Sequence, residues 1–174
     1  MTMRRIAVVG SGGAGKTTFS RRIGDVLALP VIHLDHHFWK PGWTETPRDE
    51  WRRMQEEMVA ADRWVIDGNY GGTMEIRFAR ADTIIVLDYP RVLCMARALR
   101  RSVLAFGQET QAPGCPERVD PGFYRWIWDY PAQGKARMMA KLREHGADAA
   151  WVWLTSPSQA DRWLAALRRR PDHR

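Results

Sequence analysis

The stretch GSGGAGKTT, residues 10–18, lies between a short apolar run and the start of an amphipathic helix. Its first eight residues match G-x-x-x-x-G-K-[ST] in full, with the strand before and the helix after that this pattern requires. Glycines let successive backbone N–H groups turn inward, and the helix start adds a positive dipole end. We therefore predict an ATP-binding phosphate loop formed by Gly10, Gly12, Gly13, Ala14, Gly15, Lys16, Thr17 and Thr18.

Two side chains of this loop have distinct expected tasks. Lys16 is expected to reach the outer phosphates as a mobile positive charge. The Thr17 hydroxyl is a hard oxygen ligand of the kind that Mg²⁺ prefers. A plain glycine-rich turn would not need lysine followed by threonine, so the pattern indicates ATP and Mg²⁺ but does not name the reaction.

Strand and helix patterns alternate along the chain. Continuous apolar runs, expected of strands buried on both faces of a parallel sheet, occur at residues 4–9, 31–34, 64–67, 83–88 and 150–154. Helical patterns lie between them, with start signals at Thr46-Pro47, Asp120-Pro121 and Ser156-Pro157. The alternation predicts a single α/β domain over residues 1–174, a three-layer α/β/α sandwich around a parallel sheet. Residues 35–62 and 106–130 do not fit the bare sandwich and are expected to cross the sheet edge where ligands bind.

Composition narrows the class of protein. The chain is 45% hydrophobic, so it can bury a core, and no apolar run approaches the roughly 18–20 residues that span a bilayer. Its two cysteines, Cys94 and Cys115, show no pairing pattern, and we expect a cytoplasmic protein, monomer or homodimer. The net charge of +7 comes mostly from arginines spread along the chain, which leaves nucleic-acid binding open but not favoured.

Several motifs resemble adenylate-kinase-like proteins and, more closely, the bacterial DNA topology modulation (FlaR-like) proteins. They are HLDHHFWKPGW (33–43), WVIDGNYGGT (64–73), ADTIIVLDYPR (81–91), GCPERVD (114–120) and FYRWIWDYP (123–131). The resemblance implies a P-loop NTPase fold with strand order 2-3-1-4-5 and a mobile lid over about 102–130. It also implies a place for the metal-organising carboxylate, at the end of a strand beside the phosphate loop. Asp67 and Asp88 both qualify, and Asp67 is favoured because it matches the Asp-Gly of the kinases.

The resemblance also suggests which arginines act on the transferred phosphoryl group. Arg97 and Arg101 are four residues apart, so they share a helix face, and in similar kinases such arginines close on that group. Arg100 is a weaker candidate. Arg118, Arg125 and Arg137 could each reach phosphate when the lid shuts, and the spacing does not rank them. The single cysteine of the lid excludes a zinc site of the four-cysteine kind.

The acceptor side is expected after the second strand. Asp35 is the candidate that holds or deprotonates the acceptor hydroxyl, as an acidic residue does there in many small-molecule kinases. A metal cluster of His33, His36 and His37 is conceivable but fits no trusted zinc spacing. Trp39 and Trp43 could wall an acceptor pocket or only pin the loop.

The sequence departs from the adenylate kinase pattern at one motif, and this departure bears on the identity of the acceptor. Adenylate kinases continue Asp-Gly-x-x-Arg, with the arginine on the acceptor phosphate, whereas residues 67–71 read Asp-Gly-Asn-Tyr-Gly. Asn69 and Tyr70 offer hydrogen bonds instead. Either Arg77 substitutes from the following helix, or the acceptor carries no phosphate.

The expected function is therefore transfer of the γ-phosphoryl group of ATP to a nucleoside monophosphate or a hydroxylated metabolite. Lys16, Arg97, Arg101 and Asp35 would be catalytic, with Thr17 and Asp67 organising the metal. The alternative is an ATP-responsive regulatory or DNA-associated protein with little kinase activity. A GTPase is disfavoured because no Asn-Lys-x-Asp guanine motif occurs.

Overall fold

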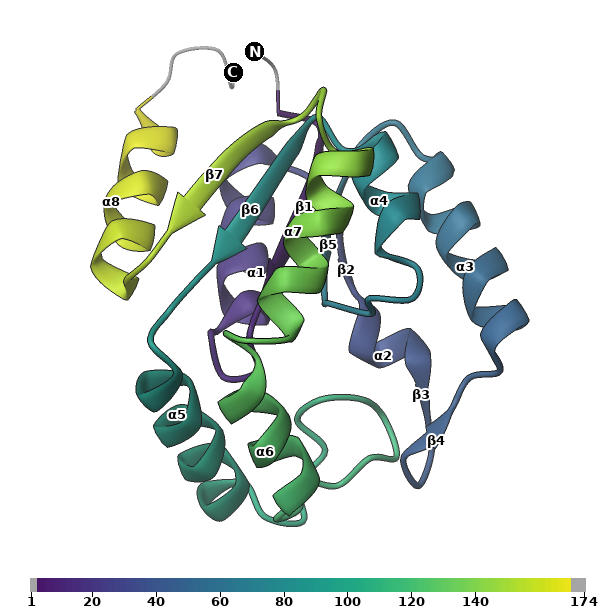
Figure 1. Cartoon of the computed structure of the whole chain (residues 1–174), viewed down its shortest axis with the longest axis vertical. Coiled ribbons are helices and arrows are strands. Elements are labelled where there is room, and N and C mark those ends of the chain that lie inside the picture. The colour runs from purple at the N-terminus through teal and green to yellow at the C-terminus, as the bar shows by residue number, and fades with distance from the viewer. Residues whose placement is uncertain (1–2, 170–174) are drawn as a thin grey trace.

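The computed structural model describes residues 3–169, and its centre is a five-stranded sheet in which every strand pair is parallel (Figure 1). Across the sheet the strands are β2 (Val31–His33), β5 (Trp64–Asp67), β1 (Arg5–Gly10), β6 (Thr83–Leu87) and β7 (Ala150–Leu154). Numbered within this sheet, the order is 2-3-1-4-5, which confirms the predicted fold class. β1, which leads into the phosphate loop, is therefore the central strand.

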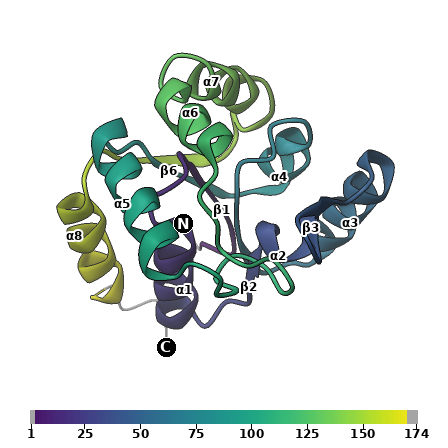
Figure 2. The same cartoon turned by 90° about the horizontal axis from the view of Figure 1, so that it is seen from below.

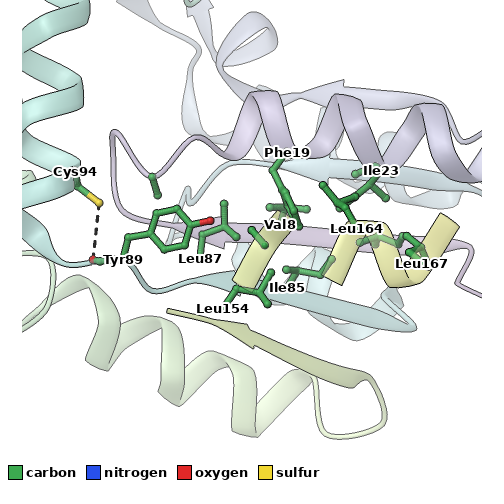
Figure 3. Packing of buried hydrophobic residues seen from close by; sticks show 14 of the residues in the cluster. Val8, Phe19, Ile23, Ile85, Leu87, Tyr89, Cys94, Leu154, Leu164 and Leu167 are labelled. Atoms are coloured by element: carbon green, nitrogen blue, oxygen red, sulfur yellow. Dashed lines mark hydrogen bonds between the residues drawn. The ribbon is translucent and has the colours of Figure 1, made fainter. Parts of the chain in front are cut away.

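Helices cover both faces of the sheet (Figure 2). Along the chain, the helices are α1 (Lys16–Leu27), α2 (Leu34–Phe38), α3 (Arg48–Ala60), α4 (Met74–Arg80), α5 (Arg91–Leu104), α6 (Pro121–Asp129), α7 (Gly134–His145) and α8 (Pro157–Arg168). Alternate residues of β1 point to opposite faces: Ile6 and Val8 enter the core beneath α1 and α8, and Ala7 and Val9 enter the core beneath α3, α4 and α7. Figure 3 shows the first of these cores, where Val8 and Ile85 of the sheet meet helix residues such as Leu164.

Two excursions extend beyond the carboxyl ends of the strands and touch each other. The first contains α2 and the antiparallel hairpin of β3 (Trp39–Lys40) and β4 (Thr44–Glu45). The second is the loop 105–120 between α5 and α6. Gly42 N donates to Gly114 O at 2.8 Å, and Trp43 Nε1 donates to Pro116 O at 3.0 Å. These bonds tie the predicted acceptor-side segment to the predicted lid.

Helix starts were predicted with mixed success. Asp120 and Ser156 are the N-caps of α6 and α8 and accept hydrogen bonds from Phe123 N and Gln159 N. Thr46 was wrongly expected to cap α3. Its hydroxyl instead donates to Phe38 O at 2.6 Å, and α3 begins at Arg48 with Pro47 as an N-cap that has no side-chain bond. Thr46 is buried, and its hydroxyl bonds the end of α2 instead of capping α3.

The Ser156 cap gives a stability prediction. Ser156→Ala removes the acceptor for Gln159 N, which lies 3.3 Å from the hydroxyl, and should lower the free energy of unfolding by about 1 kcal/mol. Urea unfolding measures this change. Ser156→Asp is the matched control, because aspartate caps equally well and should keep wild-type stability. Equal stability of the wild type and Ser156→Ala would contradict the prediction.

Two further observations bear on the class of protein. Within residues 3–169, no helix has both the length and the apolar character needed to cross a bilayer. Cys94 and Cys115 are both buried and free, as the lack of a pairing pattern indicated.

Candidate active site

A cavity of about 810 Å³ lies at the carboxyl ends of the strands, between the phosphate loop, the hairpin and the loop 105–120. At one side it reaches Pro157, Ala160 and Asp161 of α8. At the other it reaches Asp35, Trp39 and Trp43, and all of Gly12 to Thr18 line it between the two. The structure therefore brings the predicted phosphate loop and the predicted acceptor residues into one hollow.

The backbone of the phosphate loop is shaped by glycine. Gly13 has φ +75°, and a Cβ there would stand 2.1 Å from the carbonyl oxygen of Cys94 in α5. Gly15, at φ +86°, is the N-cap of α1 and offers no side-chain bond to the first turn. The first N–H groups of α1 are thus not bonded by a capping side chain, and they lie at the cavity wall where an anion would satisfy them.

Lys16 is a half-buried cation. Its Nζ donates to the carbonyl oxygens of Gly10 and Ser11, both at 3.0 Å, and no carboxylate of residues 3–169 forms an ion pair with it. Burial lowers the pKa of Lys16, while the charges of Asp35 and Asp67 act in the opposite direction. A half-buried ammonium in the cavity wall without an acidic partner fits the phosphates of ATP.

Asp67 lies at the end of β5, buried, and shares its carboxylate with His33. Asp67 Oδ2 is 2.5 Å from His33 Nδ1, and Arg21 Nε donates to His33 Nε2 at 3.2 Å. Since Nε2 accepts this bond, the ring proton is on Nδ1 and is donated to Asp67. One oxygen of Asp67 thus has no bond to a residue of 3–169, so Asp67 fits a metal only as one ligand among several.

Asp88, the competing carboxylate, has structural partners. Its Oδ2 accepts hydrogen bonds from Lys135 Nζ at 2.6 Å and from Trp153 Nε1 at 3.0 Å. Neither Asp88 nor Asp67 is part of the cavity wall. These contacts tie the end of β6 to α7 and β7, which agrees with a structural role.

The predicted arginines separate into two groups. Arg97, Arg101 and Arg118 line the cavity. Arg97 Nη1 lies 3.8 Å from where a Cβ on Gly15 would stand, and Arg101 Nε forms a 3.0 Å ion pair with Glu117. The arginines that do not line it, all exposed, are Arg100, Arg125 and Arg137. Among the lid candidates, then, Arg118 alone has the position for a phosphate contact in this arrangement.

Two cavity arginines were missed from the sequence. Arg21 and Arg22 lie on α1 and both line the hollow, where Arg22 pairs with Asp161 at 2.7 Å. Their positions on the polar face of an amphipathic helix looked like those of any solvated arginine, so the helical pattern carried no signal for them.

Asp35 follows β2, in α2, and accepts a hydrogen bond of 2.5 Å from the Tyr70 hydroxyl. Burial, and then the negative charge of Asp35, raise the pKa of Tyr70, so the phenol stays protonated and keeps donating. Asn69 holds the same loop to the phosphate loop: its amide donates to Gly10 O at 2.7 Å and accepts from Gly10 N at 3.1 Å. Donor and acceptor sides are therefore joined through residues 69 and 70.

Arg77 does not substitute as an acceptor-phosphate ligand. Its side chain is fully buried and binds Gln55 and the carbonyl oxygens of Gly68 and Asn69, the last at 2.6 Å. Burial lowers the pKa of Arg77. Its role is to hold the loop after β5 from below, and Gln55, which sequence reasoning missed, is its partner on α3.

The histidines do not form a metal cluster. Within residues 3–169, no group of three or more histidine, cysteine or acidic side chains could hold a metal ion. His36 and His37 are exposed, and partial burial together with neighbouring histidines lowers the pKa of each. The remaining arrangement suits a metal held by one carboxylate, a hydroxyl and substrate phosphates.

Solved structures share this fold. Shikimate kinase from Acinetobacter baumannii in complex with shikimate aligns with a TM-score of 0.64 at 17% identity, over 95% of this chain and 91% of that one. Shikimate kinase from Bacteroides thetaiotaomicron aligns with a TM-score of 0.57 at 18% identity, over 95% and 97%. A sugar kinase from Janibacter sp. HTCC2649 aligns with a TM-score of 0.52 at 19% identity, over 97% and 96%.

These neighbours show that the chain has the fold of small P-loop kinases. At such identities they establish the fold and not the acceptor. No protein-family model and no curated protein sequence matches the chain.

Proposed function

We propose that this protein transfers the γ-phosphoryl group of ATP to a hydroxyl group of a small acceptor. The observation that carries the proposal is the shared cavity, in which Lys16 and the free first turn of α1 face the same space as Asp35. Kinases of this fold, such as the shikimate and sugar kinases above, support the reaction class.

The transfer step assigns a task to each group. The acceptor oxygen forms a bond to the γ-phosphorus, the bond from that phosphorus to the β-γ bridging oxygen breaks, and ADP leaves. Asp35 accepts the hydroxyl proton through its oxygen that Tyr70 does not occupy. Lys16 and Arg97 balance the charge on the equatorial oxygens, and Arg101 joins them from the adjacent turn of α5.

Thr17, in the cavity wall, and Asp67, at the end of β5, would hold Mg²⁺. When bound, the ion neutralises charge on the phosphates. Asp67 is preferred to Asp88 because Asp88 accepts two bonds, from Lys135 and Trp153, whereas Asp67 accepts one, from His33.

The general experiment is an ADP-release screen of the protein with ATP and Mg²⁺ across nucleoside monophosphates, nucleosides and sugar acids. A phosphotransferase consumes ATP faster with the right acceptor. A flat screen with ATP still bound would overturn the proposal and favour the regulatory, DNA-associated alternative that the FlaR-like motifs suggest. That alternative requires DNA binding that persists at physiological salt and changes with ATP.

Asp35→Asn tests the assignment of the base. With the acceptor that the screen identifies, kcat should fall by roughly 10²–10⁴-fold because asparagine cannot accept the hydroxyl proton. Asparagine keeps the size of the side chain and its bond to Tyr70, so binding of a fluorescent ATP analogue should be unchanged. Glu45→Gln, an exposed change on the hairpin, is the control. Asp35→Asn with wild-type kcat would show that another group takes the proton.

A further inference from the structure

Two residues with strained backbone lie in the acceptor half of the cavity, which is the part lined by Asp35, Trp39, Trp43 and Tyr70. Within residues 3–169, three non-glycine residues have positive φ: Ala28, Trp43 and Tyr70. Ala28 is the C-cap of α1, where this conformation is common. Trp43, at φ 62°, and Tyr70, at φ 41°, both line the cavity. Backbone strain of this kind is concentrated at binding sites, where the surrounding structure keeps the residue in an unfavourable conformation.

The strained Trp43 forms an aromatic corner with Trp39. The two ring centroids are 5.4 Å apart and the ring planes meet at 71°, so the rings form two adjacent, steeply inclined surfaces. Trp43 Nε1 is bonded to Pro116 O, and the Arg118 guanidinium lies over the Trp43 ring, 5.2 Å from its centroid, so a ligand that stacks on that face must displace Arg118. Both indoles are partly exposed and line the hollow. A ligand with a flat apolar face fits such a corner.

Tyr70 positions Asp35, the residue that would bind the ligand hydroxyl. Its ring packs against Phe38 and Trp51, with centroids at 4.7 and 5.0 Å, and its hydroxyl is bonded to Asp35 Oδ1. Asp35 Oδ2 has no hydrogen-bond partner among residues 3–169. It is therefore free to accept a bond from a ligand hydroxyl while Trp39 and Trp43 hold the ring.

The cations near the acceptor residues already have protein partners, and Arg21, which lines the cavity, donates to His33 Nε2. Arg77 is buried beneath the loop, Arg101 is paired with Glu117, and Arg118 is paired with Asp120 at 3.4 Å. Glu117 and Asp120 also line the cavity, as does Asp35. A phosphate monoester would add negative charge beside these carboxylates.

We propose that the acceptor is a phosphate-free ring alcohol, bound with one flat face against Trp39 and Trp43 and with a hydroxyl on Asp35. This inference rests on the proposed function and narrows it, since it excludes nucleoside monophosphates. Two kinds of molecule share the chemistry, a nucleoside with its planar base and a cyclic polyol with an apolar ring face. The experiment separates them.

Isothermal calorimetry of the full chain, saturated with Mg²⁺ and a non-hydrolysable ATP analogue, tests the proposal. The probes are adenosine, cytidine, shikimate and myo-inositol, each beside its own monophosphate, with glycerol as a probe without a ring. We expect at least one ring alcohol to bind, at least tenfold more tightly than its monophosphate and than glycerol. Binding by nucleosides alone identifies the first source, and binding by cyclic polyols alone the second.

Variants test the aromatic corner. Trp39→Leu and Trp43→Asn should each weaken binding of the ring alcohol at least tenfold, with affinity for the ATP analogue unchanged. Asparagine is chosen because it tolerates positive φ better than most residues, so Trp43→Asn should not unfold the hairpin. The matched control is Trp128→Leu, a partly exposed tryptophan of α6 that is not part of the cavity wall and should bind as wild type does.

Three results would overturn the proposal: a monophosphate that binds more tightly than its alcohol, wild-type binding by both corner variants, or an ATP analogue that binds while no ring alcohol does. The last leaves nucleotide binding standing. If the ATP analogue itself does not bind, the proposed function fails and this inference fails with it.

Discussion

Lys16→Met is expected to lower the rate of phosphoryl transfer by at least roughly 10²–10³-fold while the protein stays folded. The Lys16 side chain is half-buried, its ammonium is hydrogen-bonded only to the carbonyl oxygens of Gly10 and Ser11, and it has no acidic partner among residues 3–169. It can therefore move to the phosphates of ATP without breaking an ion pair. Methionine keeps the length of the side chain but removes the charge.

The free energy of unfolding should not fall in Lys16→Met. Burial lowers the pKa of Lys16, which means that the folded state disfavours the charged form. Removing that charge should leave the free energy of unfolding unchanged or raise it. The measurements are ADP release with the identified acceptor and urea unfolding of the same preparation.

The control for Lys16→Met is Arg100→Met, an exposed position of α5 outside the cavity. It should change neither activity nor stability by a measurable amount. Loss of activity in Lys16→Met together with loss of folding would contradict the account above, because the lysine would then be a structural residue.

Much of the fold was predictable because its signals are local. The phosphate loop is contiguous in sequence, and the buried strands are continuous apolar runs. The strand order came from the resemblance of distributed motifs rather than from periodicity. The hairpin Trp39–Glu45 was not predictable, because its strands are two residues long and its contacts, such as Trp43 to Pro116, join residues far apart in the chain.

The location of a site residue was predictable where its place directly after a parallel strand is enough to define it. Asp35 follows a parallel strand, so its place at the carboxyl edge could be inferred. Asn69 was expected to offer hydrogen bonds, but its partner, Gly10, is known only from the fold. Arg77 shows the limit: an arginine that faces a cavity and one that is buried under a loop have the same appearance in a sequence. What distinguishes them is Gln55, which α3 brings beneath the loop.

Arg77→Met is expected to lower the free energy of unfolding by about 2–4 kcal/mol. The change leaves the carbonyl oxygens of Gly68 and Asn69 and the amide oxygen of Gln55 buried without their donor, at roughly 1–3 kcal/mol for each group left unpaired. Relief of the buried charge offsets part of this cost, since burial already lowers the pKa of Arg77. Urea unfolding measures the difference, with Arg53→Met on the exposed face of α3 as the control, expected within 0.5 kcal/mol of wild type.

The same variant separates two roles for Arg77. If the guanidinium supports the loop that carries Asn69 and Tyr70, Arg77→Met lowers stability and weakens every acceptor alike, because Tyr70 no longer holds Asp35 in place. If Arg77 instead turned into the cavity to bind an acceptor phosphate, stability would be kept and only phosphorylated acceptors would bind more weakly. The second result would reverse both the assignment of Arg77 and the inference that the acceptor lacks a phosphate, since a cation would then be reserved for one.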